Sequence, residues 1–177
     1  MYSFCFRMKK ILPVLFITIL FITIASCEKD DICVDADTPL LVIGFFDSAD
    51  TTLSKTVPSL RIREVVLDTN INTIADRSSS LDSIAVPLRI DSSSTGFTFI
   101  TESADDETSG AETGSIDSLT ISYTTREAFI SRACGFVANY DDLSVALSPN
   151  GANWIQDIRI VQTTIENSNN IHVKIFH

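Results

Sequence analysis

The sequence predicts an all-β protein whose main domain is an antiparallel β-sandwich, either immunoglobulin-like or transthyretin-like. Three observations favour this class. About eight or nine short segments are apolar or alternate between apolar and polar residues, as strands do. Turn-forming residues separate these segments at short intervals. After the apolar N-terminal stretch, no segment shows a helical spacing of apolar residues, and two packed antiparallel sheets suit such a pattern.

The strand candidates differ in how clearly they are marked. The cleanest alternation is in residues 118–124, where Leu119, Ile121 and Tyr123 should face the core. The alternation in the second candidate shifts after Glu64, which predicts a bulge. Pro87 places the third candidate at a sheet edge or a bulge, because proline cannot donate a ladder hydrogen bond. In chain order, the candidates span residues 40–46, 60–67, 84–90, 97–99, 118–124, 129–140, 143–147, 154–165 and 171–177.

Two polar stretches are predicted as turns and one as a longer loop. Asn150 and Gly151 follow a proline and tolerate the positive φ that tight turns require, and residues 167–170 turn the chain into its last strand. Residues 102–116 are rich in Asp, Glu, Ser, Thr and Gly and contain no aromatic residue, which predicts a mobile acidic loop. Calcium binding is the alternative for this loop, but the ligand and glycine spacing of a calcium loop is missing.

The N-terminus has the composition of a bacterial lipoprotein signal peptide over residues 1–26. Basic residues precede an uncharged apolar run, and the small residues Ala25 and Ser26 end it directly before Cys27. The thiol of Cys27 is therefore the predicted lipidation site. We expect residues 27–38 to form a lipidated tether and residues 39–177 to form a single β-sandwich domain.

A transmembrane helix is the alternative reading of the apolar run. A helix needs about 20 apolar residues to cross a bilayer, and the run between Lys10 and Cys27 is shorter than that. A short run of this kind is more typical of a signal peptide. Two or more acyl chains anchor a protein stably in a membrane, whereas a single chain does so only marginally.

Removal of residues 1–26 leaves 151 residues, enough for one domain with a sizeable core. The removed segment carries three basic residues and no acids, so the formal net charge changes from −10 to −13. A chain this acidic lacks the basic surface that would attract nucleic acids or anionic lipid head groups. We therefore expect no nucleic-acid partner, and the acyl chains must supply the attachment to the lipid bilayer.

Two cysteines remain in the mature chain besides Cys27. In an oxidising compartment, Cys33 and Cys134 are expected to form a disulfide. The chain-entropy model gives about 4.7 kcal/mol for a loop of about 100 residues, which is close to the separation here. Two buried free thiols are the alternative. A metal site is disfavoured, because two cysteines without a nearby histidine are too few ligands.

Three blocks of the sequence resemble a known family. They are Cys27–Cys33 with its charged residues, Ser131–Phe136 around Cys134, and the ending His172–His177. Together they are similar to the domain-of-unknown-function 6452 family of Bacteroidota lipoproteins. The resemblance implies an exported, lipid-anchored, mostly β protein, and it transfers no catalytic residues.

The residues that carry chemistry form no recognisable catalytic motif. His172 and His177 fall on opposite faces of an extended strand, and His172 is expected to face solvent. No nucleophile elbow, phosphate loop or dinucleotide motif is present. Trp154 has two readings, a partly buried core aromatic or a platform for a sugar. We expect no enzymatic activity, no cofactor and no metal.

The leading functional hypothesis is a non-enzymatic structural or interaction subunit of an outer-membrane assembly. Its expected location is the outer membrane of the cell envelope, anchored through Cys27 on the periplasmic or the surface-exposed face. An outer-membrane β-barrel protein is the expected kind of partner. The alternative is a surface lipoprotein that binds a glycan or another small ligand.

Overall fold

The computed structural model describes residue 33 and residues 37–177. The predicted signal peptide, the lipidation site Cys27 and most of the tether lie outside these residues. Residues 37–177 all belong to one compact unit.

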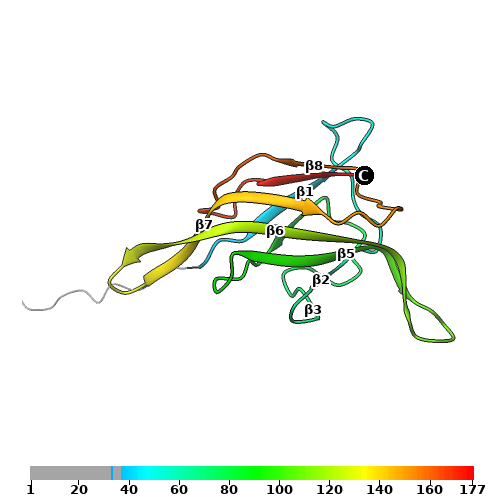
Figure 1. The fold of residues 1–177 in the computed structure, drawn as a ribbon, viewed down its shortest axis with the longest axis horizontal. Helices are drawn as coiled ribbons and strands as arrows, with labels where there is room; N and C mark the ends of the chain where they lie inside the picture. The colour runs from blue at the N-terminus through cyan, green and yellow to red at the C-terminus, as the bar shows by residue number, and fades with distance from the viewer. Residues whose placement is uncertain (1–32, 34–36) are drawn as a thin grey trace, which may run out of the picture. The chain divides into compact units, whose positions relative to one another are not determined.

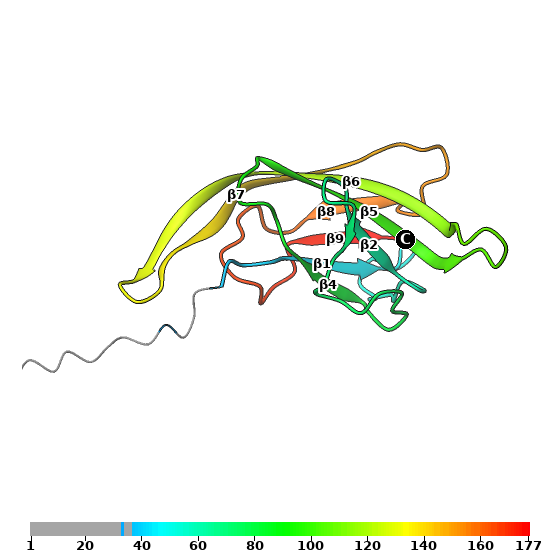
Figure 2. The ribbon, with the colours of Figure 1, turned by 90° about the horizontal axis from the view of Figure 1, so that it is seen from below.

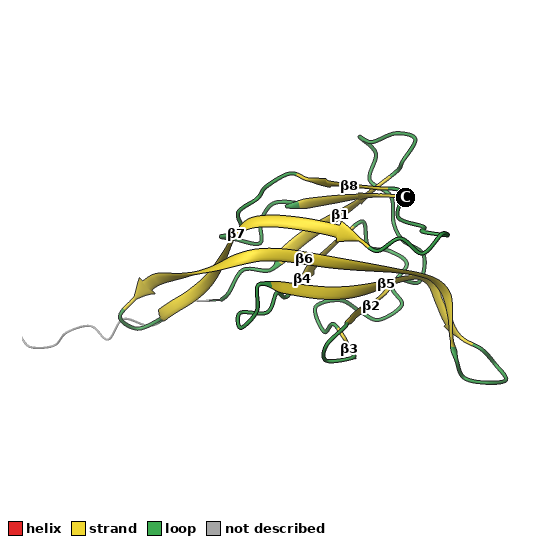
Figure 3. Cartoon of the chain, in the orientation of Figure 1, coloured by secondary structure: helices red, strands yellow, loops and turns green. Residues whose placement is uncertain are grey.

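Two β-sheets make up this unit, and the residues described contain no helix (Figures 1 and 3). One sheet has four strands in the order β4-β1-β9-β8, and the other has five in the order β3-β2-β5-β6-β7. The predicted all-β class is therefore confirmed for residues 37–177. The strands are β1 Leu41–Phe46, β2 Arg61–Glu64, β3 Thr69–Asn70, β4 Ser83–Val86, β5 Ser94–Asp105, β6 Glu112–Ser131, β7 Gly135–Leu147, β8 Asp157–Ile160 and β9 Val173–Phe176.

One apolar core joins the two sheets. Alternate residues of the strands other than β3 point into it, as the predicted period of two requires, whereas both residues of β3 are exposed. Leu119, Ile121 and Tyr123 of β6 all lie in this core, as predicted. The pairing differs from the expected antiparallel sandwich at one place, because β1 and β9 run parallel from Ile43 opposite Val173 to Phe46 opposite Phe176.

Strands β6 and β7 form a long curved ribbon that extends beyond the rest of its sheet (Figure 2). Strand β5 pairs with β6 only as far as Ser122. From Thr124 to Ser131, β6 pairs with β7 alone among the described strands. We call this two-stranded extension, residues 124–141, the arm. The expected strand over residues 129–140 is wrong, because the chain turns inside it and Cys134 lies in that turn.

Three other predicted strands are shorter than expected. Strand β2 ends at Glu64, where a turn replaces the predicted bulge and β3 pairs back with β2. Strand β4 ends at Val86, directly before Pro87, as the missing amide hydrogen of proline demands. The candidate over residues 154–165 is a strand only in β8.

The acidic loop is also shorter than predicted. Strand β5 continues to Asp105 and β6 begins at Glu112, so only residues 106–111 connect them. The pairing is interrupted by a bulge between Thr101 and Ala104. Opposite the bulge, Gly114 has a φ of 109°, and a Cβ there would collide with the carbonyl oxygen of Thr101. Backbone hydrogen bonds thus impose strand structure on a polar segment that lacks apolar alternation.

Candidate functional site

The two histidines take part in packing. His172 is 1% exposed, and its Nδ1 accepts a 3.1 Å hydrogen bond from the Val42 N–H. The expectation that His172 faces solvent is therefore wrong. Burial lowers the pKa of this imidazole, although its hydrogen bond with the Asn167 backbone acts in the opposite direction. A neutral ring engaged by two backbone groups is poorly placed to exchange protons with a substrate.

His177 and Trp154 also pack against other residues of the fold. Their rings meet edge to face with centroids 5.6 Å apart. The indole Nε1–H of Trp154 points to the carbonyl oxygen of Phe99 at 3.4 Å. Trp154 is half-buried against the core, which confirms the reading as a core aromatic. Burial lowers the pKa of His177 as well.

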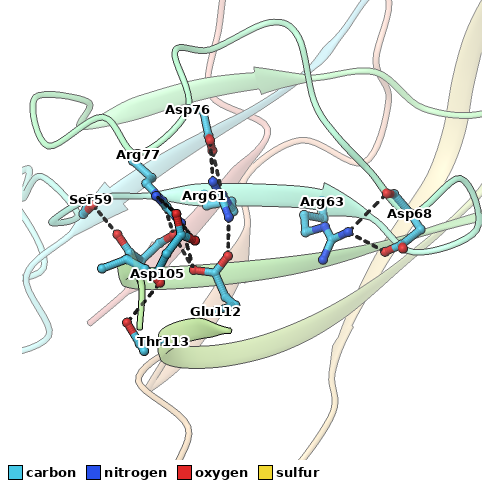
Figure 4. Close-up of polar contacts among 11 residues, drawn as sticks. Ser59, Arg61, Arg63, Asp68, Asp76, Arg77, Asp105, Glu112 and Thr113 are labelled. Atoms are coloured by element: carbon cyan, nitrogen blue, oxygen red, sulfur yellow. Dashed lines mark hydrogen bonds and ion pairs between the residues drawn. The ribbon is translucent and has the colours of Figure 1, made fainter. Parts of the chain in front are cut away.

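A network of arginines and carboxylates surrounds the β5–β6 hairpin where its strands meet the connecting loop (Figure 4). Arg61 of β2 makes a two-point ion pair with Asp76, with distances of 2.9 Å from Nε to Oδ1 and 2.7 Å from Nη2 to Oδ2. The same guanidinium contacts Glu112, the first residue of β6. Arg77 pairs in the same way with Asp105, the last residue of β5.

Two of these ion pairs hold the carboxylates of Asp76 and Asp105 in their charged form. The side-chain hydrogen bond from Arg61 is the largest effect that lowers the pKa of Asp76. The hydrogen bond from Arg77 does the same for the pKa of Asp105. A general acid needs a pKa raised toward neutrality, so these two carboxyl groups are suited to structure rather than to proton transfer. The network ties the loop between β3 and β4 to the β5–β6 hairpin.

Asp117 is a carboxylate whose burial the sequence did not predict. It has 0% exposure and shares the inward face of β6 with Leu119. Its Oδ1 accepts hydrogen bonds from the side-chain amides of Asn150 and Asn153 at 2.9 and 2.8 Å. Its Oδ2 accepts one from the Ile155 N–H at 2.8 Å. This carboxylate organises the turn after β7. The sequence does contain a signal for its burial, because Asp117 is two residues from Leu119 and therefore on the same face of the strand.

A recess of about 390 Å³ lies beside Arg89. Its polar lining includes Thr95, whose hydroxyl is 2.6 Å from the buried Tyr123 hydroxyl. The Tyr123 hydroxyl also donates to the carbonyl oxygen of Arg89 at 2.7 Å. Residues from β2, from β3 and its flanking segments, and from the segment after β4 complete the lining: Glu64, Leu67, Thr69, Asn70, Ile71, Asn72, Pro87 and Leu88.

Three consecutive apolar residues between β2 and β3 are exposed next to this recess. Val65, Val66 and Leu67 are 53%, 70% and 63% exposed, and we call them the apolar turn. Their backbone is held in place, because the Glu64 carboxylate accepts hydrogen bonds from the N–H groups of Val66 and Leu67. A second recess borders Val65 and Val66 and shares Arg89 with the first. The turn is thus a fixed apolar projection between two hollows.

The second exposed apolar surface is at the end of the arm. Phe129 of β6 and Phe136 of β7 are directly opposite each other, with ring centroids 5.3 Å apart. They are 59% and 65% exposed, and the neighbouring Ile130 is 44% exposed. We call residues 129–136 the tip. The tip contains Cys134, which is half-buried in the turn rather than inside the domain.

Cys33 and Cys134 are both disulfide-bonded. The oxidised state of these two residues agrees with the prediction, whereas their pairing with each other stays a prediction. Cys27, the predicted lipidation site, lies outside the described residues. Within the residues described, no group of three or more His, Cys, Asp and Glu side chains is arranged to hold a metal ion.

These features define an all-β protein with two packed sheets, a projecting two-stranded arm and two exposed apolar surfaces. The chain belongs to the family of unknown function DUF6452, whose model matches residues 59–177. No curated protein and no solved structure matches the chain. In the part of the chain that the structure describes, no helical segment has the length and hydropathy needed to cross a bilayer.

Proposed function

We propose that this protein is a Bacteroidota lipoprotein of the outer membrane that serves an envelope assembly as a non-enzymatic interaction subunit. The composition of residues 1–26 and the position of Cys27 support export and acylation. Acyl chains on Cys27 hold the domain at the membrane, on its periplasmic or its surface-exposed face. The proposal includes a disulfide between Cys33 and Cys134, which ties the tether to the tip of the arm.

The main support for the interaction role is the exposure of the apolar turn. Contiguous exposed apolar residues on a soluble domain often mark a surface where another protein binds. Here Val66 and Leu67 stand on a backbone that Glu64 fixes through two hydrogen bonds, so little ordering is needed on binding. The flanking hollows give a partner's side chains somewhere to pack. An outer-membrane β-barrel protein is the kind of partner we propose.

Site-specific photo-crosslinking in the native host tests this role. A photoreactive residue at Val66 should capture one defined envelope protein in intact cells, because Val66 is the most exposed residue of the apolar turn. The matched control carries the same residue at Thr108, which is exposed in the β5–β6 connection. Equal capture patterns at the two positions, or no envelope protein at Val66, would contradict the proposal.

A charge variant gives an independent check. Val66→Asp should abolish co-purification of the captured protein, since an aspartate in an apolar contact must be desolvated without a partner charge. Thr108→Asp adds the same charge away from the apolar turn and should have no effect. Both positions are exposed, so neither change should alter thermal unfolding by much.

The recess beside Arg89 favours the alternative function, binding of a glycan or another small ligand. Asn70, Asn72 and Arg89 line it and offer hydrogen-bond donors and acceptors suited to hydroxyl groups. A glycan array should then give a hit that Asn70→Ala weakens at least about tenfold, the effect of losing one or two hydrogen bonds. Trp154→Ala should leave that affinity unchanged, because Trp154 does not line the recess. An array without hits would remove this alternative.

A further inference from the structure

The tip of the arm exposes large apolar side chains at the end of a ribbon that has only two strands. Phe129 and Phe136 pack on each other across the ribbon, yet each leaves more than half of its surface in contact with solvent. An isolated two-stranded hairpin is at best marginally stable in water. The tip therefore has apolar surface to bury and little structure of its own around it.

The charge of the tip is unlike that of the chain as a whole. The sequence has a net charge of −10, but residues 128–138 contain no acid and a single basic residue, Arg132. Arg132 is exposed in the turn, between the two strands that carry the phenylalanines. Apolar and aromatic side chains beside a basic residue are the composition that settles at a membrane interface. The nearest acids in the sequence are Glu127, directly before this segment, and Asp141, three residues after it.

The chain enters the domain on the side where the arm begins. Residues 37–40 line a hollow together with residues 166–168, and the Leu40 N–H donates to the Ser168 hydroxyl at 2.8 Å. Glu166 of that loop pairs with Arg126 of the arm at 2.7 Å. Figures 1 and 2 both show the start of β1 at the end of the domain from which the arm projects.

The length of the tether limits how far the tip can be from the acylated residue. Residue 37 is ten residues after Cys27, which at full extension spans about 35 Å. The proposed disulfide is a tighter limit, because Cys33 is six residues after Cys27 and six residues span about 20 Å. With Cys134 inside the tip, the phenylalanines are held close to the membrane surface that carries the anchor.

We infer that the tip is a second membrane contact, in which Phe129, Ile130 and Phe136 enter the boundary between head groups and acyl chains of a phospholipid bilayer. This inference rests on the acyl anchor and the disulfide in the proposed function. Arg132 lies at the level of the phosphate groups. Three apolar side chains bury too little surface to hold a domain at a bilayer by themselves. They suffice to orient a domain that an acyl anchor already holds at the bilayer.

Depth-dependent fluorescence quenching tests the inference on the mature acylated protein. Phe136→Trp places an indole at the tip, and the protein is reconstituted in phosphatidylcholine vesicles with or without brominated acyl chains. The fluorescence that the introduced indole adds to that of Trp154 should fall to about half or less with the brominated lipid, and its emission should shift to shorter wavelength, because an inserted indole leaves water. Thr108→Trp, in the β5–β6 connection, is the matched control and should show neither effect.

A second variant separates insertion from simple proximity. Ile130→Trp should also be quenched, and the quenching should disappear when Phe129 and Phe136 are both changed to Ser. Circular dichroism of that triple variant should match the parent spectrum, since the changed side chains are outside the core. Quenching that persists without the two phenylalanines would overturn the inference.

The remaining outcomes distinguish this inference from the proposed function. If mass spectrometry finds acyl chains on Cys27 but the Phe136→Trp variant is not quenched, the tip inference is overturned and the anchor stands. If Cys27 carries no acyl chain, the anchor is wrong, and quenching of the Phe136→Trp variant in added vesicles still decides whether the tip inserts. A photoreactive residue at position 136 that captures a protein and no lipid would also overturn the inference.

Discussion

Val42 and His172 are joined twice, although 130 residues separate them in the sequence. The His172 N–H donates to the Val42 carbonyl oxygen at 2.9 Å, and the Val42 N–H donates to His172 Nδ1 at 3.1 Å. The imidazole thus takes the place of a backbone carbonyl at the end of the β1–β9 ladder, which begins at Ile43 and Val173. A buried side chain completes the sheet where the backbone pairing ends.

His172→Ala should destabilise the domain by about 3 kcal/mol, because it leaves the Val42 N–H without an acceptor and opens a cavity. Urea unfolding followed by circular dichroism measures the loss. His172→Asn keeps a side-chain acceptor near Nδ1 and should lose clearly less. Asn170→Ala, at an exposed position in the preceding loop, is the control and should cost little. Equal losses for the alanine and asparagine variants at position 172 would show that the hydrogen bond is unimportant.

Acidification should weaken the domain below the ordinary histidine pKa of 6.5. Burial lowers the folded-state pKa values of His172 and His177, so the unfolded chain takes up protons first as the pH falls. The histidine contribution to stability is therefore complete above a pH of about 6.5 and declines as the pH drops from there through the folded-state pKa values. The urea midpoint should be lower at a pH of about 5 than at about 8, and His172→Asn should reduce that difference. A midpoint that rises on acidification would contradict this assignment.

Asp117→Asn should cost about 2–4 kcal/mol even though it preserves the shape of the side chain. The carboxylate accepts three hydrogen bonds from neutral donors, and an amide would turn its own N–H groups toward one or more of them. Thermal unfolding at neutral pH measures this effect. Asn153→Ala removes one of the three donors to this carboxylate, together with the hydrogen bonds of Asn153 to Ser148 and Asn150, and should cost less than Asp117→Asn. An Asp117→Asn variant that unfolds at the same temperature as the parent protein would contradict this role of the carboxylate.

Asp76→Asn should have only a small effect, about 1 kcal/mol, because the Asp76 side chain is 39% exposed and solvent screens its ion pair with Arg61. The loss should shrink as salt is added. Asp68→Asn is the matched control, since Asp68 pairs with Arg63 but is 81% exposed, and its effect should be near zero. A larger loss for Asp68→Asn than for Asp76→Asn would reverse this ranking.

Non-reducing peptide mapping of the mature protein should find Cys33 and Cys134 in one cross-linked pair. Both residues are disulfide-bonded, and they are the two cysteines that the proposed lipidation of Cys27 leaves available. Reduction should lower the thermal midpoint, with a loss of stability of about 2–4 kcal/mol. A peptide that links either residue to a cysteine of another chain would contradict the pairing.

The sequence by itself determined the all-β class and much of the inward-facing pattern. Alternation between apolar and polar residues can be recognised from adjacent residues alone. Leu119, Ile121 and Tyr123 were therefore predicted correctly to lie in the core. The turn around Asn150 and Gly151 was also predictable, because the positive φ of 80° at Gly151 is a local property of glycine. Local chemistry decided these features, and local chemistry is visible in the sequence.

Tertiary structure alone decided the features that depend on distant partners. His172 can be buried because the backbone of Val42 accepts a hydrogen bond from its N–H and donates one to its ring. Asp117 can be buried because a turn more than 30 residues later supplies the hydrogen-bond donors for its carboxylate. The acidic segment became strand because β5 and β6 pair across it. The burial of a polar group depends on whether its hydrogen bonds are satisfied, and that depends on residues that only the folded chain brings together.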